Sequence, residues 1–187
     1  MLAALPLVSA CGGGGSAASG LPATGPITAA GSRSKVTFTI AVPRPAASSQ
    51  ARPAYVSPAT QSMTINVLQG GSSVVSQTVG LTASSTGCTS SLASVTCTLQ
   101  LTLNAGSYTA SITTYDAANA TGNALSTAQN VAFTVTAGQN NLVPLSLSGI
   151  PTSVSVTAAS STSVDVVAKD ADGNYIVGSG APTYTAA

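Results

Sequence analysis

Charged and aromatic side chains are scarce in this chain of 187 residues. Charged residues make up 5%, with five Lys and Arg against four Asp and Glu, and neither His nor Trp occurs. Nucleic-acid binding needs a basic surface that displaces counterions from phosphates, so we expect no nucleic-acid partner. The absence of His removes the commonest general base near neutral pH and the commonest metal ligand. We therefore expect a protein without enzymatic activity and without a cofactor.

Long hydrophobic runs are also missing. The mean hydropathy is +0.39, but Ala, Val, Leu and Ile are interleaved with Ser, Thr, Asn and Gln throughout the chain. A membrane-spanning helix needs about 20 consecutive, mostly apolar residues. We expect no such helix beyond the short apolar N-terminus.

The chain alternates apolar and polar residues with a period of two, which is typical of strands with one buried face. No stretch keeps helical spacing for more than a turn or two, and burial of one face favours antiparallel sheets. The sequence therefore predicts an all-β protein, with strands at 35–42, 63–67, 74–81, 95–103, 108–114, 131–135 and 143–147.

Turn residues separate these strands. Gly70-Gly71, Asn104–Gly106 and Ala137–Asn140 fall between them, where turns need positive φ or local side-chain hydrogen bonds. Pro144 cannot donate to a ladder, which predicts an edge or a bulge at that position. About seven strands with regular turn signals indicate an antiparallel β-sandwich over residues 35–149.

A second structural unit is predicted from residue 150 onward. Residues 154–156 and 164–168 indicate two strands, and 174–185 offers a third. So short a segment cannot bury a sandwich core alone. We expect residues 150–187 to be the start of a second domain that is truncated.

The first residues resemble the export signal of a bacterial lipoprotein. An apolar stretch ends in Leu5–Ala10, Cys11 follows, and Gly12–Gly15 come next. The charged n-region of a secretory signal is missing from segment 1–11. The resemblance implies lipidation of Cys11, attachment to a membrane through that lipid, and a place in the bacterial cell envelope, at the outer membrane or cell surface. Residues 12–34 then form a flexible Gly/Ser/Ala linker. The alternative is a chance cysteine after a hydrophobic stretch.

Cys88 and Cys97 are the other two cysteines. In an exported protein, two nearby cysteines favour a disulfide. With Cys11 used by a lipid, the remaining count is even, which supports this pairing. The alternative is a pair of free thiols in the core.

Two further stretches resemble immunoglobulin-like (Ig-like) domains. Leu103–Ile112 looks like their late strand, in which a tyrosine, here Tyr108, follows a glycine turn and anchors the corner. Ala168–Gly178 is similar to the Asp-x-x-Gly-Asn hairpin of bacterial Ig-like domains in surface and adhesin proteins. Together with the N-terminal segment, the chain resembles a bacterial lipoprotein that carries tandem Ig-like domains.

Asp170, Asp172 and Asn174 alternate as oxygen ligands do in some calcium loops. An EF-hand, however, has its glycine at the sixth position and a closing Glu, whereas Gly173 stands at the fourth and no Glu follows. The alternative is a hairpin turn in which Asp and Asn bond their own backbone and glycine takes positive φ. We expect no metal ion, and these three residues are the only candidates to hold one.

Two short motifs match known patterns by coincidence. Ser32 and Lys35 have the Ser-x-x-Lys spacing of penicillin-binding enzymes, but the further Ser-Asp-Asn and Lys-Thr-Gly motifs of those enzymes do not occur. Asn119-Ala120-Thr121 is a glycosylation sequon, which in a bacterial protein indicates a polar loop.

These observations favour a non-enzymatic, lipid-anchored cell-envelope protein whose Ig-like domains act as spacers or adhesive modules, with a protein or glycan ligand that the sequence does not identify. The alternative is a carbohydrate- or matrix-binding accessory module of a larger, truncated protein. Sugar-binding platforms usually need exposed Trp or Tyr. Tyr108 is expected to be buried, which leaves Tyr55, Tyr115, Tyr175 and Tyr184.

Overall fold

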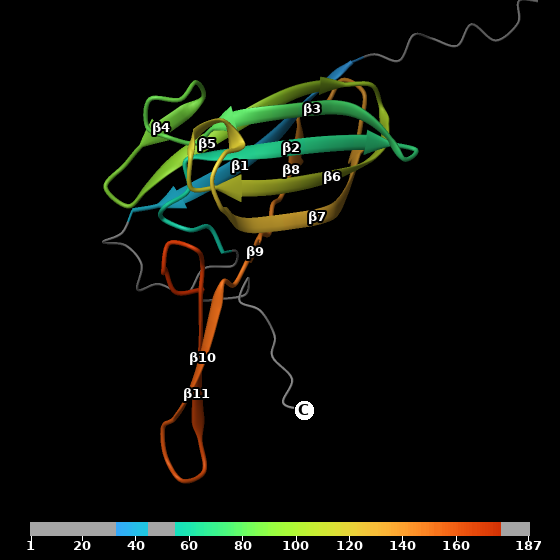
Figure 1. Ribbon diagram of the computed structural model, residues 1–187. Coiled ribbons are helices and arrows are strands. Elements are labelled where there is room, and N and C mark those ends of the chain that lie inside the picture. Colours follow the sequence, from blue (N-terminus) through green and yellow to red (C-terminus); the bar gives the residue numbers. More distant parts are fainter. Residues whose placement is uncertain (1–32, 45–54, 177–187) are drawn as a thin grey trace, which may run out of the picture. The chain divides into compact units, whose positions relative to one another are not determined.

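Two β-sheets share one hydrophobic core in the computed structural model, which describes residues 33–44 and 55–176 (Figure 1). One sheet contains, in order, β4 (Cys88–Ser90), β5 (Ser94–Leu103), β1 (Ser34–Pro43) and β8 (Asn141–Val143). The other contains β3 (Ser72–Gly80), β2 (Ser62–Gln69), β6 (Gly106–Tyr115), β7 (Ala124–Val135) and β9 (Ser148–Gly149). The prediction of an all-β protein is confirmed.

The first sheet is built on β1, whose sequence alternates without interruption. Val36, Phe38, Ile40 and Val42 each expose at most 4% of their surface, whereas the residues between them point away from the core. β5 pairs antiparallel with β1 over ten residues, from Ser34–Leu103 to Pro43–Ser94. The two strands therefore present one continuous apolar face to the second sheet.

The second sheet is centred on β2 and β6. β2 pairs antiparallel with β3 on one side and with β6 on the other, and buries Met63, Ile65 and Val67. A two-residue turn, Gly70-Gly71, joins β2 to β3 with φ of 57° and 84°. Positive φ at both positions is the geometry of a type I′ hairpin turn, which favours glycine. The turn predicted at these glycines is confirmed.

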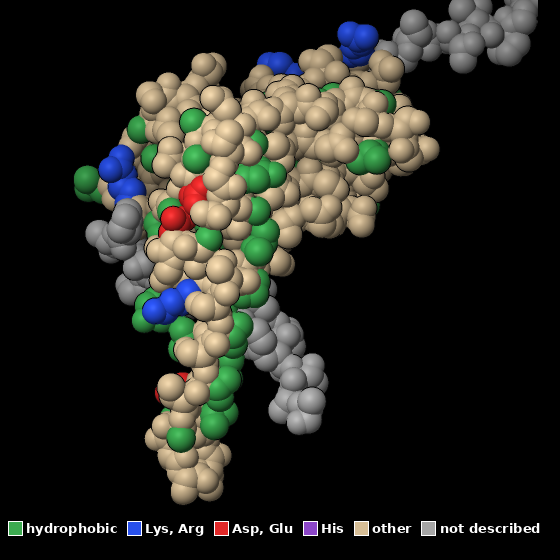
Figure 2. Space-filling model, viewed as in Figure 1, with side chains coloured by type: hydrophobic (Ala, Val, Ile, Leu, Met, Phe, Trp, Pro, Cys, Tyr) green, Lys and Arg blue, Asp and Glu red, His purple; other side chains and the backbone are tan. Residues whose placement is uncertain are grey.

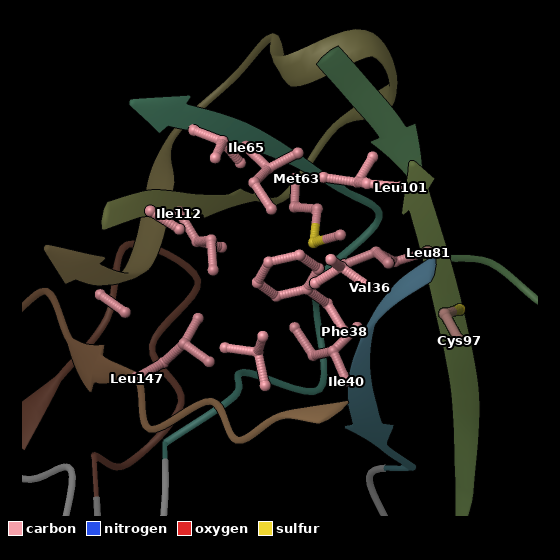
Figure 3. Packing of buried hydrophobic residues seen from close by; sticks show 14 of the residues in the cluster. Val36, Phe38, Ile40, Met63, Ile65, Leu81, Cys97, Leu101, Ile112 and Leu147 are labelled. Carbon is pink, nitrogen blue, oxygen red and sulfur yellow. The ribbon is translucent and has the colours of Figure 1, made fainter. Parts of the chain in front are cut away.

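Aromatic rings connect the two sheets. Phe133 of β7 lies edge-on to Phe38 of β1, with ring centroids 5.6 Å apart, and stacks on Tyr108 of β6 at 5.5 Å. Figure 3 shows Phe38 pointing toward Met63 of β2. Phe38 is 1% exposed, and complete burial of a Phe side chain contributes about 1.5–3 kcal/mol to stability.

β7 is longer than the strand predicted at 131–135. Ala110 of β6 pairs with Val131 and Ile112 pairs with Ala128, so two residues of β7 oppose one residue of β6. This is a β-bulge, and Asn130 within it has φ of 54°. The extra residue shifts the alternation of inward and outward positions by one. The bulge thereby breaks the period of two. For this reason the sequence pattern predicted only the second half of β7.

The expectation of purely antiparallel sheets is wrong at β8, which pairs in parallel with β1, from Val36–Asn141 to Phe38–Val143. The Asn141 side chain guides the chain to this position. Its Oδ1 accepts from the Thr136 amide at 2.8 Å, and its Nδ2 donates to the Lys35 carbonyl at 3.1 Å. The strand predicted at 143–147 ends at Val143, because Pro144 has no N–H to continue the ladder.

β10 (Ser153–Ala158) and β11 (Val164–Lys169) form an antiparallel hairpin, which confirms the strands predicted at 154–156 and 164–168. A third strand was predicted at 174–185. Within this range, Tyr175 forms an isolated antiparallel bridge with Lys169, and residues 177–187 lie outside the described part of the chain. The short strands β4 and β9 were not predicted, because two or three residues show no period. None of the helical segments that the structure describes, such as the 3₁₀ turn η2 (Ala118–Ala120), has the length and apolar character needed to cross a membrane.

Candidate functional site

Part of the predicted site lies outside the described residues. Cys11, the linker up to residue 32, and Tyr184 belong to this part. Ser32 lies there too, whereas Lys35 projects from the exposed side of β1. Lipidation therefore remains a prediction from the sequence.

Cys88 and Cys97 are joined by a disulfide with an S–S distance of 1.98 Å, as predicted. The two residues lie directly opposite each other on β4 and β5. Cys97 is buried and belongs to the hydrophobic core, whereas Cys88 is half-buried. The bond therefore fixes the edge strand β4 to a strand that runs through the core.

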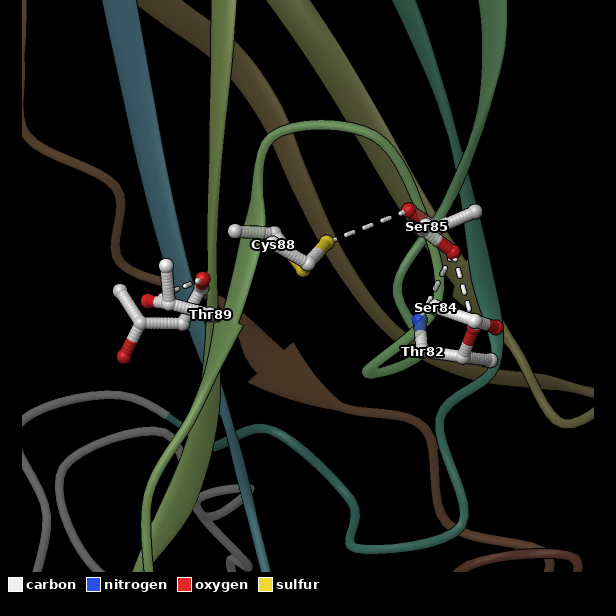
Figure 4. Close-up of a disulfide and its surroundings, with 8 residues drawn as sticks. Thr82, Ser84, Ser85, Cys88 and Thr89 are labelled. Carbon is white, nitrogen blue, oxygen red and sulfur yellow. Dashed lines mark hydrogen bonds between the residues drawn. A yellow bond between two sulfur atoms is a disulfide. The ribbon is translucent and has the colours of Figure 1, made fainter.

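The loop between β3 and β4 is held by its own hydroxyl groups (Figure 4). Ser85 Oγ accepts from the Thr82 amide at 3.1 Å, and the Ser85 amide donates to the Thr82 carbonyl at 3.0 Å. The Cys88 amide in turn donates to the Ser85 carbonyl at 3.1 Å. A compact turn therefore leads directly into the disulfide.

A groove of about 730 Å³ runs beside this loop. One wall is the edge of β3 at Gln77–Gly80, the other is β5 at Thr98–Gln100, and the loop residues Ser84–Gly87 line the groove between them. The described residues that line the groove are all uncharged. Its hydroxyl, amide and backbone groups can hydrogen-bond a neutral polar ligand or the backbone of an extended strand.

Asp170 accepts more hydrogen bonds than the other acidic residues, and only 3% of its surface is exposed. Its Oδ1 accepts from the amides of Asp172 and Asn174, at 3.0 and 2.8 Å. Its Oδ2 accepts from the Tyr55 hydroxyl at 2.7 Å. Asn174 Nδ2 lies 3.3 Å from both carboxylate oxygens, and Gly173 has φ of 78°. The carboxylate thus organises its own turn, as in the hairpin alternative.

Tyr55 and Ser57 are the partners that the sequence did not reveal. Asn174 Nδ2 donates to Ser57 Oγ at 3.2 Å, and the Tyr55 amide donates to the Leu147 carbonyl at 3.0 Å. Burial, together with the hydrogen bond to Asp170, raises the pKa of Tyr55 above its ordinary value of about 10. These bonds tie the segment before β2 to the turn after β11. No short motif marks either partner.

The three calcium candidates are arranged unequally. Asp170 is buried, Asn174 is half-buried and Asp172 is exposed. Desolvation, followed by the negative charges of Asp116 and Asp170, raises the pKa of Asp172. Across residues 33–44 and 55–176, no group of three or more His, Cys, Asp or Glu side chains is placed to hold a metal ion.

The tyrosines proposed for sugar contact are mostly enclosed. Tyr55 is buried and Tyr115 is half-buried, whereas Tyr175 is 59% exposed with the Lys169 ammonium 4.7 Å from its ring centroid. Tyr108 is buried as predicted, and its hydroxyl donates to the Asn104 carbonyl at 2.9 Å. Asn119 of the sequon is exposed on η2 with φ of 58°.

Comparisons with known proteins assign no family to the chain. No protein-family model matches it, and no curated protein matches it. A crystal structure of a leucine-rich repeat protein from Bacteroides thetaiotaomicron is similar at 17% identity with a TM-score of 0.38. The match covers 74% of this chain and 18% of that protein. A likeness at this level leaves the function to be argued from the residues.

Proposed function

We propose that this chain is a non-enzymatic, lipid-anchored protein of the bacterial cell envelope, whose Ig-like domains act as spacer or adhesive modules. The observation that carries the proposal is the path of the chain between the two sheets. In Ig-like domains strands B, E and D share one sheet, and C, C′, F and G share the other. Here β1, β5 and β4 share one sheet, and β2, β3, β6 and β7 share the other. Taken in chain order, these strands correspond to B, C, C′, D, E, F and G.

The hydrogen bond of Tyr108 supports the same assignment. Ig-like domains contain a tyrosine near the start of strand F whose hydroxyl bonds the backbone a few residues upstream. Tyr108 is the third residue of β6, and its hydroxyl donates to the carbonyl of Asn104. The strand path and this corner are independent features, since the first depends on topology and the second on one side chain.

The hairpin β10–β11 supports a second unit from residue 150. Its four exposed valines, Val154, Val156, Val164 and Val166, lie on one face and are 43–63% exposed. Figure 2 shows hydrophobic side chains along the length of this hairpin. A two-stranded hairpin is marginally stable by itself. Such a face suits packing against further strands, as in a second sandwich.

The anchor is supported by the lipoprotein-like segment ending in Cys11 and by the disulfide, which suits an oxidising compartment.

The test of the anchor is labelling of the protein in its own cells with a clickable palmitate, followed by separation of membranes from soluble protein. We expect the wild-type protein to be labelled and to sediment with membranes. Cys11→Ser should lose both properties.

The matched control is the double variant Cys88→Ala/Cys97→Ala, which also loses cysteines but keeps Cys11. It should remain labelled and membrane-bound. Wild-type protein that is unlabelled and soluble, or a Cys11→Ser variant that stays labelled, would overturn the proposed anchor. Spacer and adhesive roles are then separated by measuring whether deletion of residues 35–149 abolishes attachment of cells to a surface.

A further inference from the structure

Among the residues that the structure describes, β3 forms one edge of the second sheet. β3 is the terminal strand of its sheet and pairs with β2 only (Figure 1). No strand among the described residues pairs with its other side. Every side chain from Ser72 to Gly80 is exposed or half-buried. Cys88 Sγ lies 3.7 Å from the Gly80 carbonyl at the end of the strand. Before Gly80, the outward backbone N–H and C=O groups have no strand partner among the described residues and are available to another strand.

The edge lacks the features that usually prevent such pairing. Natural edge strands carry charged residues, proline or strong bulges, because an unprotected edge pairs with other chains. β3 contains neither a charge nor a proline. Its one irregularity lies near its start, where the register shifts and Val74 becomes the extra residue. From Val75 to Gly80 the strand pairs regularly with β2, so the opposite side of that stretch has regular geometry as well.

The groove described above lies next to this stretch. Its β3 wall is Gln77–Gly80, and the facing wall is Thr98–Gln100 of β5. The Thr98 amide of this wall donates to the Gly87 carbonyl at 2.9 Å, and beyond it this edge of β5 has no strand partner among the described residues. An incoming strand therefore has space beside β3, and the groups around it are polar and uncharged.

The sequence of β3 is complementary to itself. If two copies run antiparallel about Gln77, Val75 of one lies opposite Val79 of the other, and Ser76 lies opposite Thr78. Val75 and Val79 are half-buried and pack on the core side of the sheet, so both Val pairs meet on that side. Paired β-branched residues and Ser–Thr pairs are favourable across strands.

Charge does not oppose this pairing. Like charges directly opposite each other destabilise a strand pair, but this register brings none together. The net charge of the whole chain is +1, which leaves little repulsion between copies. A two-fold axis through Gln77 also gives a closed, isologous contact, in which the same patch serves both partners.

We propose that two copies of this chain associate through β3, antiparallel about Gln77, so that the five-stranded sheets of both copies join edge to edge. The occupant of the open edge is thus a second copy of the same strand. The contact consists mainly of backbone hydrogen bonds, with the two Val75–Val79 pairs continuing the core face from one copy to the other.

The test is sedimentation velocity of the full chain in detergent over a wide concentration range. Wild-type protein should show a concentration-dependent dimer. Gln77→Lys places two like charges opposite each other on the two-fold axis, and should raise the dimer Kd by about tenfold or more. The matched control Gln139→Lys adds the same charge at an exposed turn far along the chain from β3, and should dimerise like the wild type.

A second variant serves if Gln77→Lys fails to fold. With Gln77→Cys, mild oxidation should link two copies, and peptide mass spectrometry should map the bond to the two substituted positions. Gln139→Cys should give no such product. A wild-type protein that is monomeric at every concentration, a Gln77→Lys variant that dimerises normally, or a Gln77→Cys variant without the bond overturns the proposal. Association of β3 with a foreign protein in place of a second copy also overturns it.

Discussion

The contribution of the Cys88–Cys97 disulfide to stability can be worked out from its place in the chain. The bond closes a loop with a sequence separation of 9. In the chain-entropy model, restricting a loop of this size in the unfolded state stabilises the folded state by about 2.6 kcal/mol. Reduction leaves both thiols in place and so removes this contribution alone. Replacement of both cysteines by alanine also removes the sulfur of buried Cys97, which should cost about 1 kcal/mol more.

The assay is urea unfolding of the oxidised protein, the fully reduced protein and the double variant Cys88→Ala/Cys97→Ala. We expect the free energy of unfolding to fall by about 2.6 kcal/mol on reduction and by about 3.6 kcal/mol in the double variant. Reductant should not change the stability of the double variant. A loss below about 1 kcal/mol on reduction would refute the reasoning, because the bond would then restrict the unfolded chain little.

Three further changes test individual parts of the fold. Tyr108→Phe removes the hydrogen bond to the Asn104 carbonyl and should lower the free energy of unfolding by about 1 kcal/mol, measured by urea unfolding; an unchanged midpoint would contradict a structural role for the corner. Because the folded-state pKa of Tyr55 lies above its ordinary value of about 10, the unfolded state ionises first as the pH rises. The contribution of Tyr55 to stability should therefore be constant below about pH 10 and should fall by about 1.4 kcal/mol per pH unit above it, a slope that Tyr55→Phe should remove in urea titrations. Gly71→Ala should cost about 1 kcal/mol in thermal unfolding, because φ there is 84° while the space around the position is open; a stabilised variant would argue against the type I′ turn.

Strand prediction succeeded where alternation and burial stayed in phase. β1 keeps one face inward from Val36 to Val42, so its limits follow almost directly from the residue pattern. In β7 the alternation changes phase, because the extra residue of the bulge at Asn130 moves the inward-facing positions by one along the strand. The parallel pairing of β8 was beyond reach for a different reason. It is accompanied by a hydrogen bond from Asn141 to the carbonyl of Lys35, which lies 106 residues away in the sequence.

For the site residues too, local contacts could be predicted from the sequence, whereas contacts between distant parts of the chain could not. The turn around Asp170 could be predicted, since its acceptors and donors lie within four residues of one another. Its bond to Tyr55 spans 115 residues, and no local pattern indicates it. The disulfide was predictable because a count of cysteines is enough to suggest it. The groove was not, since it is formed by the edges of two strands that belong to different sheets.

The shortage of charge also has a structural consequence. The outward positions of β5 are filled by Thr98, Gln100 and Thr102, which hydrogen-bond water without carrying a charge. Threonine also favours strands, because its branched side chain packs well on a pleated surface. The same composition that solvates the sheets and supports the strands therefore supplies no Lys or Glu to protect an edge. In a charged sandwich, an edge such as β3 would repel its own copy. Here the repulsion is absent, and the residues of Val75–Val79 favour contact.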